Sequence, residues 1–140
     1  MKILLAVDGS PSTKRMLATL AARDELLRPD QHYTALTVLP AIPAHAASFL
    51  PQGAVHDWHE EQAEAVLAPV RAFAAQNKWA FDARYAVGHP GDEIAQLADE
   101  GQFDMIVMGT HGHSSLANVV LGSVATRVLA RTKLPVLLIH

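Results

Sequence analysis

The chain contains no cysteine among its 140 residues. That absence excludes a disulfide framework, thiol catalysis and a cysteine-ligated metal centre, and it is typical of a cytoplasmic protein. Long apolar runs are lacking as well, since none reaches the ~18 residues of a membrane span. The apolar N-terminal stretch ends at Asp8, too early for the hydrophobic region of a signal peptide. We therefore expect a cytoplasmic protein that does not contact a membrane.

An excess of positive charge is also missing. Eleven basic and fourteen acidic residues give a formal net charge of −3, and no cluster of lysine or arginine forms a local basic surface. Nucleic-acid binding is therefore not expected. The hydrophobic fraction of 50% and the charged fraction of 18% are typical of a folded globular protein. A length of 140 residues predicts one domain, covering residues 1–140.

The motifs of several enzyme classes are absent. There is no Gly-x-Ser-x-Gly elbow for a hydrolase serine, and the dinucleotide fingerprint Gly-x-Gly-x-x-Gly is missing. Gly122 is followed by Ser123 and not by the lysine of a phosphate-binding P-loop, which argues against a fast nucleoside triphosphatase. His56 and His59 lie three residues apart, but the zinc-protease pattern fails because Ala63 replaces its second histidine. We therefore expect no catalytic residue and no metal site.

The pattern of apolar residues predicts an α/β fold with a five-stranded parallel sheet. Strands buried on both faces read as continuous apolar runs, and helices connect them when the strands are parallel. The third run alternates apolar and polar residues and is expected at an edge. The expected strands are Ile3–Val7, Tyr33–Leu39, Phe81–Val87, Met105–Met108 and Val136–Ile139.

Four helical segments lie between these strands. The first begins at Ser10-Pro11, a capping residue followed by proline, and carries an apolar stripe that extends to Leu27. The second contains Pro69, which is expected to kink it. The third runs from Pro90 to Gly101. The fourth begins at Gly122-Ser123, and its inward residues are expected to be Val124, Val128 and Leu129.

The segment Pro40–Val55 has three prolines and no clear period. Structureless connections of this length are either functional loops or exposed segments. Two interpretations stay open at this point, a loop beside a ligand and a plain surface excursion.

Glycines gather after the fourth expected strand, at Gly109, Gly112 and Gly122, and Ser123 follows directly. The segment ends where a helix begins, and a helix N-terminus offers unpaired N–H groups and partial positive charge to an anion. Any one of these glycines alone is better explained by a turn, a helix cap or close strand–helix packing than by phosphate binding. Together with the serine at the helix start they favour phosphate binding.

This loop resembles that of the universal stress protein family, in the branch that binds nucleotides. That branch has a glycine, two residues, a second glycine, nine residues and a third glycine followed by serine or threonine. Gly109, Gly112, Gly122 and Ser123 match those positions. The resemblance extends along the chain through Ile3–Ser10, Gly88–Pro90 and Leu134–Ile139.

The resemblance implies a doubly wound sheet of order 3-2-1-4-5, similar to the adenine nucleotide α-hydrolases, with the ligand at the switch point between strands 1 and 4. It implies that Asp8 contacts the ribose, unless Asp8 is only a turn residue that accepts backbone N–H groups, and that the backbone of Val38 meets the adenine. Histidines 111 and 113 are expected near the phosphates, where protonation favours an anion. The expected nucleotide-binding residues are Ala6, Val7, Asp8, Ser10, Val38, Met108, Gly109, Gly112, His113, Gly122, Ser123 and Val124.

The function implied is that of a regulatory stress-response protein that binds ATP, with or without Mg²⁺, and turns over little or none of it. AMP or another adenine nucleotide is an alternative ligand. A homodimer through Val136–Ile139 is expected, because an apolar, uncharged sheet edge needs cover. Two other functions stay open: a slow ATPase or autophosphorylating protein, and a nucleotide-free dimeric interaction module. The acceptor hydroxyl in the first case would be one of Thr110, Ser114, Ser115 and Ser123.

Overall fold

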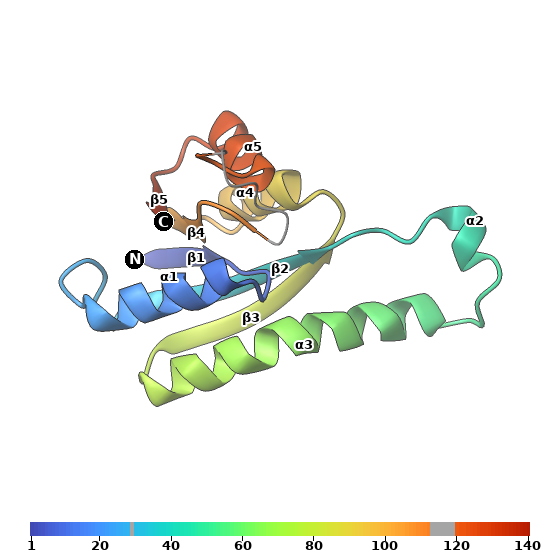
Figure 1. Cartoon of the computed structure of the whole chain (residues 1–140), viewed down its shortest axis with the longest axis horizontal. Coiled ribbons are helices and arrows are strands. Elements are labelled where there is room, and N and C mark those ends of the chain that lie inside the picture. The colour runs from blue at the N-terminus through green and yellow to red at the C-terminus, as the bar shows by residue number, and fades with distance from the viewer. Residues whose placement is uncertain (29, 113–119) are drawn as a thin grey trace.

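A computed structural model describes residues 1–28, 30–112 and 120–140. Strands and helices alternate along the chain, as the apolar pattern predicts, except that a short helix, α2, precedes α3 between β2 and β3 (Figure 1). The elements are β1 (Lys2–Ala6), α1 (Pro11–Ala22), β2 (His32–Leu39), α2 (Ala44–Ala47), α3 (Ala54–Gln76), β3 (Ala80–Val87), α4 (Pro90–Glu100), β4 (Met105–Gly109), α5 (Ser123–Arg131) and β5 (Val136–Ile139).

The five strands form one parallel sheet in the order β3-β2-β1-β4-β5, so the expected fold class and strand order are confirmed. Ala6 pairs with Leu36 on one side of β1, and Leu5 pairs with Val107 on the other. α1 and α5, the helices that follow β1 and β4, lie on opposite faces of the sheet. The carboxyl ends of β1 and β4 are therefore the switch point of the sheet, where sheets of this type form a crevice.

Helices α1 and α3 cover one face of the sheet, and α4 and α5 cover the other (Figure 1). β1 contributes to both layers. Ile3 and Leu5 face the core beneath α1 and α3, Leu4 faces the core beneath α4 and α5, and all three are 0% exposed. Burying each of these side chains contributes about 1.5–3 kcal/mol. The central strand therefore fixes the position of the crevice at its carboxyl end.

Two helices differ from the expected packing. α1 ends at Ala22, so Leu27 is buried from the turn that follows the helix and not from its stripe. In α5 the fully buried residues are Ala125 and Val128, whereas Leu129 is 43% exposed. A nine-residue helix that meets its neighbours along one side buries residues three apart and leaves the adjacent position outward. α3 continues through Pro69.

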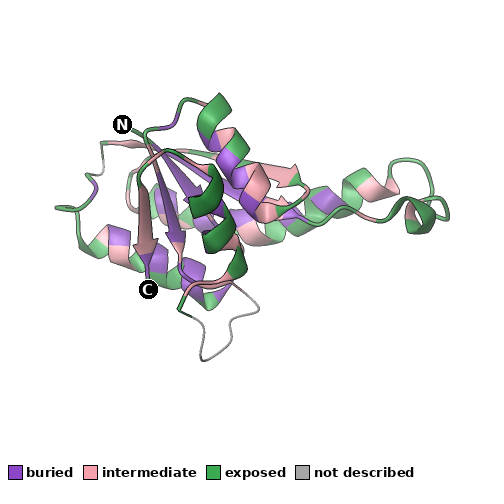
Figure 2. Ribbon diagram, turned by 90° about the horizontal axis from the view of Figure 1, so that it is seen from above, coloured by how far each residue is buried: buried purple, intermediate pink, exposed green. Residues whose placement is uncertain are grey.

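The segment Pro40–Val55 projects from the body as an arm that carries α2 and the first residues of α3 (Figures 1 and 2). Phe49, near its tip, is 76% exposed. None of the arm's residues lines the crevice. Of the two interpretations, the surface excursion holds. No helix among the described residues has the length and apolar character to cross a membrane.

Candidate functional site

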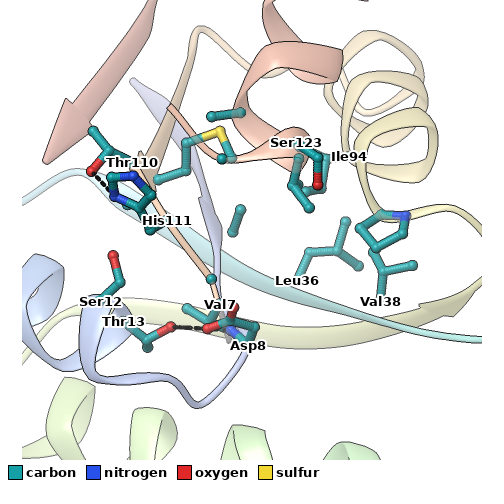
Figure 3. Close-up of a pocket in the computed structure, with 18 residues that line it drawn as sticks. Val7, Asp8, Ser12, Thr13, Leu36, Val38, Ile94, Thr110, His111 and Ser123 are labelled. Carbon is teal, nitrogen blue, oxygen red and sulfur yellow. Dashed lines mark hydrogen bonds between the residues drawn. The ribbon is translucent and has the colours of Figure 1, made fainter. Parts of the chain in front are cut away.

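A cavity of about 520 Å³ occupies the crevice at the carboxyl ends of β1 and β4 (Figure 3). Its volume is in the range typical of small-molecule sites. The wall is built from the ends of three strands and the first turns of three helices, α1, α4 and α5. The lining residues are Ala6, Val7, Asp8, Ser12, Thr13, Leu36, Val38, Pro90, Ile94, Met108, Gly109, Thr110, His111, Gly112, Gly122, Ser123, Val124 and Ala125.

The structure brings most of the predicted site residues to this one wall. Ser10 is different, since it lies 0% exposed beneath the cavity and does not line it. His113 lies outside the described residues. The residues placed on the wall are Ala6, Val7, Asp8, Val38, Met108, Gly109, Gly112, Gly122, Ser123 and Val124. That they contact a ligand stays a prediction.

Several lining residues were not among those predicted. Ser12 and Thr13 lie in the first turn of α1, shortly after Asp8. Their closeness to Asp8 in the sequence could have identified them as site residues. Leu36 and Ile94 come from β2 and α4 and carry no local motif. An apolar residue of a strand or a helix is read as core, and only the tertiary structure places these two on the wall of the cavity.

The wall has an apolar part and a polar part. Figure 3 shows Leu36, Val38 and Ile94 on one side of the cavity, with Ser123 beside Ile94. Ser12, Thr13, Thr110 and His111 lie on the other side in the same view, and Asp8 lies between the two sides, next to Val7. Such a wall suits a ligand with a flat apolar ring at one end and polar or charged groups at the other.

Asp8 organises the turn that begins α1. Its Oδ1 accepts hydrogen bonds from the amide of Ser10 and the hydroxyl of Thr13, each at 2.9 Å, and its own amide donates to Thr13 Oγ1 at 3.1 Å. The role of a turn residue is therefore present. Ser10 occupies the N-cap position, but its side chain makes no capping bond, and its buried Oγ has no hydrogen-bond partner among the described residues.

The glycines of the loop are required by space and not by backbone angle. A positive φ occurs at Gly9, 76°, whereas the described loop glycines have none. A Cβ at Gly112 would lie 2.7 Å from Asp8 Oδ2, and one at Gly122 would lie 3.1 Å from the carbonyl oxygen of Thr110. At Gly109 a Cβ would overlap Ser12 Oγ. Close neighbours thus account for all three positions: the side chains of Ser12 and Asp8 at Gly109 and Gly112, and the backbone of Thr110 at Gly122.

The first turn of α5 faces the cavity through Ser123, Val124 and Ala125. Its N-cap is Gly122, in extended conformation, and no side chain of the described residues caps the helix. The amide of Gly122 itself donates to the carbonyl of Thr110 at 2.6 Å. A helix start without a side-chain cap is suited to an anionic oxygen, which can accept from its N–H groups.

Two imidazoles meet one hydroxyl where β4 and β5 end. Thr110 Oγ1 lies 3.1 Å from Nδ1 of His111 and 3.1 Å from Nδ1 of His140. A hydroxyl has one proton, so it donates to one ring nitrogen and accepts from the N–H of the other. His111 is the member that lines the cavity.

An ion-pair cluster joins α4 and α5. Arg127 Nε lies 2.7 Å from Asp92 Oδ1, and Arg131 Nη1 lies 3.1 Å from the same oxygen. The hydrogen bond from Arg127 lowers the pKa of Asp92 below its ordinary value of 3.8, with desolvation acting in the opposite direction. The cluster ties α5 to α4, and both helices contribute to the wall.

His56 and His59 of α3 contact different partners. His56 Nε2 lies 3.6 Å from Glu60, while His59 is buried with its Nε2 3.1 Å from the carbonyl oxygen of Pro40. His59 therefore anchors the base of the projecting arm.

A doubly wound parallel sheet with a cavity at its switch point is the arrangement in which open α/β proteins bind their ligands. The sequence profile described as "Universal stress protein family" matches residues 1–140. The chain belongs to the universal stress protein family.

Relatives in this family align over the whole chain. The "universal stress protein in QAH/OAS sulfhydrylase 3'region" of Thermus aquaticus is 33% identical over 145 residues, covering 99% of this chain and 97% of that protein. Universal stress protein Slr1230 of Synechocystis is 28% identical over 136 residues, covering 97% of this chain and 41% of that protein. This chain therefore spans less than half the length of Slr1230.

Solved structures share the fold. Protein MJ0577 of Methanocaldococcus jannaschii superimposes with a TM-score of 0.82 at 24% identity, covering 99% of this chain and 94% of that one. A universal stress protein in complex with cAMP gives 0.66 at 25% identity, covering 100% and 96%. The family member At3g01520 of Arabidopsis thaliana, with AMP bound, gives 0.70 at 19% identity, covering 99% and 90%.

Proposed function

We propose that the protein binds an adenine nucleotide in this cavity as a cytoplasmic regulatory component of a stress response and turns over little or none of it. The observation that carries the proposal is that most of the predicted site residues line one cavity of about 520 Å³. Apolar side chains form part of its wall, and the start of α5, which no side chain of the described residues caps, forms another part. Relatives of the same fold are known with cAMP and with AMP bound, which supports the adenine part of the proposal.

Each part of the nucleotide has a place on the wall. The adenine lies against Val38, Leu36 and Ile94, the ribose hydroxyls donate to Asp8, and the phosphates accept from the N–H groups at the start of α5. One helix terminus contributes only about 0.3–2 kcal/mol towards an anion, whereas micromolar binding needs about 8 kcal/mol. Burial of the adenine must therefore supply much of the affinity. ATP, bound with Mg²⁺, and AMP both belong to the proposed ligand class.

Mass spectrometry of the nucleotide released when the purified protein is denatured tests this proposal. An adenine nucleotide at near-stoichiometric amount is expected, and the same nucleotide should be recovered after purification in a second buffer system. If none is released, and titration with AMP, cAMP and ATP produces no heat, the protein is better described as a nucleotide-free interaction module.

A second candidate function rests on Thr110. A hydroxyl within 3.1 Å of two imidazole nitrogens has the geometry of an activated nucleophile. In that case Thr110 Oγ1 attacks the terminal phosphorus of ATP, its proton passes to a histidine Nδ1, and ADP leaves. Incubation with γ-labelled ATP followed by peptide mapping tests this. Label on Thr110 that Thr110→Val abolishes would support autophosphorylation, and an unlabelled protein would exclude it.

A further inference from the structure

The start of α1 is a second helix terminus on the polar side of the cavity. Ser12 and Thr13, which belong to the first turn of α1, both line the cavity and are each 5% exposed. The N-cap residue, Ser10, makes no capping bond with its side chain. The first N–H groups of α1 therefore lack a side-chain acceptor among the described residues, as they do at the start of α5.

Ser12 adds a hydroxyl to this helix start. Its Oγ forms no hydrogen bond with any described residue, whereas the hydroxyl of the neighbouring Thr13 donates to Asp8. Figure 3 shows the Ser12 hydroxyl pointing away from α1 and towards His111. Nearly all buried polar side chains have a hydrogen-bond partner. A hydroxyl that is almost fully buried, has no such partner and lines a cavity therefore points to a polar group of a ligand.

The glycine at the end of β4 makes room for this hydroxyl. A Cβ at Gly109 would overlap Ser12 Oγ and would lie 3.1 Å from Ser12 Cβ. The side chain of Ser12 thus occupies the space that any other residue at position 109 would fill. The start of α1 and the start of the glycine loop therefore meet at one point of the wall.

The order of the groups across the cavity gives this point a place along the nucleotide. Figure 3 shows Leu36 and Val38 on one side, together with Ser123 at the start of α5. Asp8 lies in the middle, and Ser12 lies on the opposite side. With the adenine on the apolar side and the first phosphate at the start of α5, any further phosphates extend across the cavity towards Ser12.

We infer that the start of α1 is a second phosphate subsite, in which Ser12 Oγ and the N–H groups of the first turn donate to the terminal phosphate of an adenosine di- or triphosphate. Anionic oxygens are the acceptors that a hydroxyl and a helix start together suit best. This inference rests on the proposed function and specifies the ligand class of the same cavity. It makes Ser12 a residue that determines specificity for the number of phosphates.

Isothermal titration of the full chain with adenosine, AMP, ADP and ATP, all in Mg²⁺ at one ionic strength, tests the inference. In the unmodified protein ATP is expected to bind at least about tenfold more tightly than AMP, the gain from one further hydrogen bond to a charged group. ATP that binds no more tightly than AMP would overturn the inference and leave the proposed function intact. Failure of all four compounds to bind would remove both.

Ser12→Ala removes the hydroxyl alone. The affinity for ATP should fall at least about tenfold, while the affinities for AMP and adenosine should stay as they are in the unmodified protein. The melting temperature should not fall, because Ser12 Oγ has no hydrogen bond with a described residue to lose. A structural role of Ser12 would instead change the affinities for AMP and ATP by the same factor, and that result would overturn the inference, as would an unchanged affinity for ATP.

Ser10→Ala is the matched control. Ser10 lies at the same helix start, is 0% exposed, and its hydroxyl also lacks a partner among the described residues, but it does not line the cavity. Ser10→Ala should therefore leave the affinity for ATP relative to AMP unchanged. If Ser10→Ala lowers that ratio as much as Ser12→Ala does, the effect belongs to the packing of α1, and the subsite is overturned.

Discussion

Asp8 and Thr13 are joined by two reciprocal hydrogen bonds. The amide of Asp8 donates to Thr13 Oγ1 at 3.1 Å, and the Thr13 hydroxyl donates to Asp8 Oδ1 at 2.9 Å. Thr13 is 5% exposed, so the pair fixes the acidic side chain at the floor of the cavity from inside the first turn of α1. The orientation of Asp8 thus depends on a residue five positions away.

Replacing Thr13 by valine keeps its shape and removes both bonds. We expect Thr13→Val to lower the free energy of unfolding by about 1–3 kcal/mol, because the part-buried amide and carboxylate of Asp8 each lose a hydrogen-bond partner. Urea denaturation measures this loss, and titration with AMP should show weaker binding. Thr13→Ser keeps the hydroxyl and should behave almost as the unmodified protein; equal losses in both variants would show that the methyl group is what matters.

Gly122 lies where the glycine loop meets α5. In Gly122→Val the new side chain would crowd the carbonyl of Thr110 and the proposed phosphate position, so nucleotide affinity should fall at least about tenfold. Loss of stability should stay near ~1 kcal/mol, the scale of a poor N-cap. Titration paired with thermal melts separates the two effects. Val120→Ala, at an 81% exposed position of the same loop, is the control. Unchanged binding in Gly122→Val would contradict the phosphate assignment.

The outer edge of β5 is the predicted dimer contact. The carbonyls of Pro135 and Ile139 accept hydrogen bonds from β4, so Leu138 presents its N–H to the opposite edge. Leu138→Pro removes that outward donor, which an edge strand tolerates. We expect light scattering to show a dimer for the unmodified protein and a monomer for Leu138→Pro. Leu138→Ala loses a similar side chain and keeps the donor, so it should stay dimeric. A monomeric unmodified protein would refute the prediction.

Turnover of ATP is expected to be very slow. The sequence offers no P-loop lysine, and no lysine or arginine of the described wall is placed to stabilise a transferring phosphoryl group. Steady-state phosphate release should remain well below ~1 per second. The measurement needs a preparation of Gly122→Val purified in parallel, because a contaminating ATPase would be equally active in both. A rate near one per second that this variant loses would place the protein among enzymes.

The Asp92 cluster predicts a pH dependence of stability. Its pKa is lowered mainly by the hydrogen bond from Arg127, so the folded state favours the carboxylate. The resulting stabilisation is complete above the ordinary value of 3.8 and is lost as the pH falls through the lower folded value. Thermal melts should therefore show Asp92→Asn less stable than the unmodified protein at about pH 7, with the gap closing below about pH 4. The same gap at both ends would argue against the ion pair.

Much of the fold could be predicted from the sequence because its signals are local. Continuous apolar runs mark strands buried on both faces, and the pair Ser10-Pro11 marks the start of α1. The alternation in Phe81–Val87 correctly places β3 at an edge. Where a signal was weak, the prediction was wrong: Leu129 shares the apolar character of its neighbours, and only the packing of α5 decides which face is covered.

The glycine loop and Asp8 stand out in the sequence because their residue types are constrained by backbone geometry. Leu36 and Ile94 do not, because an apolar side chain on a strand or helix looks the same whether it packs in the core or lines a cavity. What the sequence by itself determined is the five strands, the four long helices, the parallel sheet and the polar residues of the site, whereas the short helix α2 was not predicted. The tertiary structure alone decided the apolar half and the arm's direction, because these depend on contacts between segments far apart in the chain.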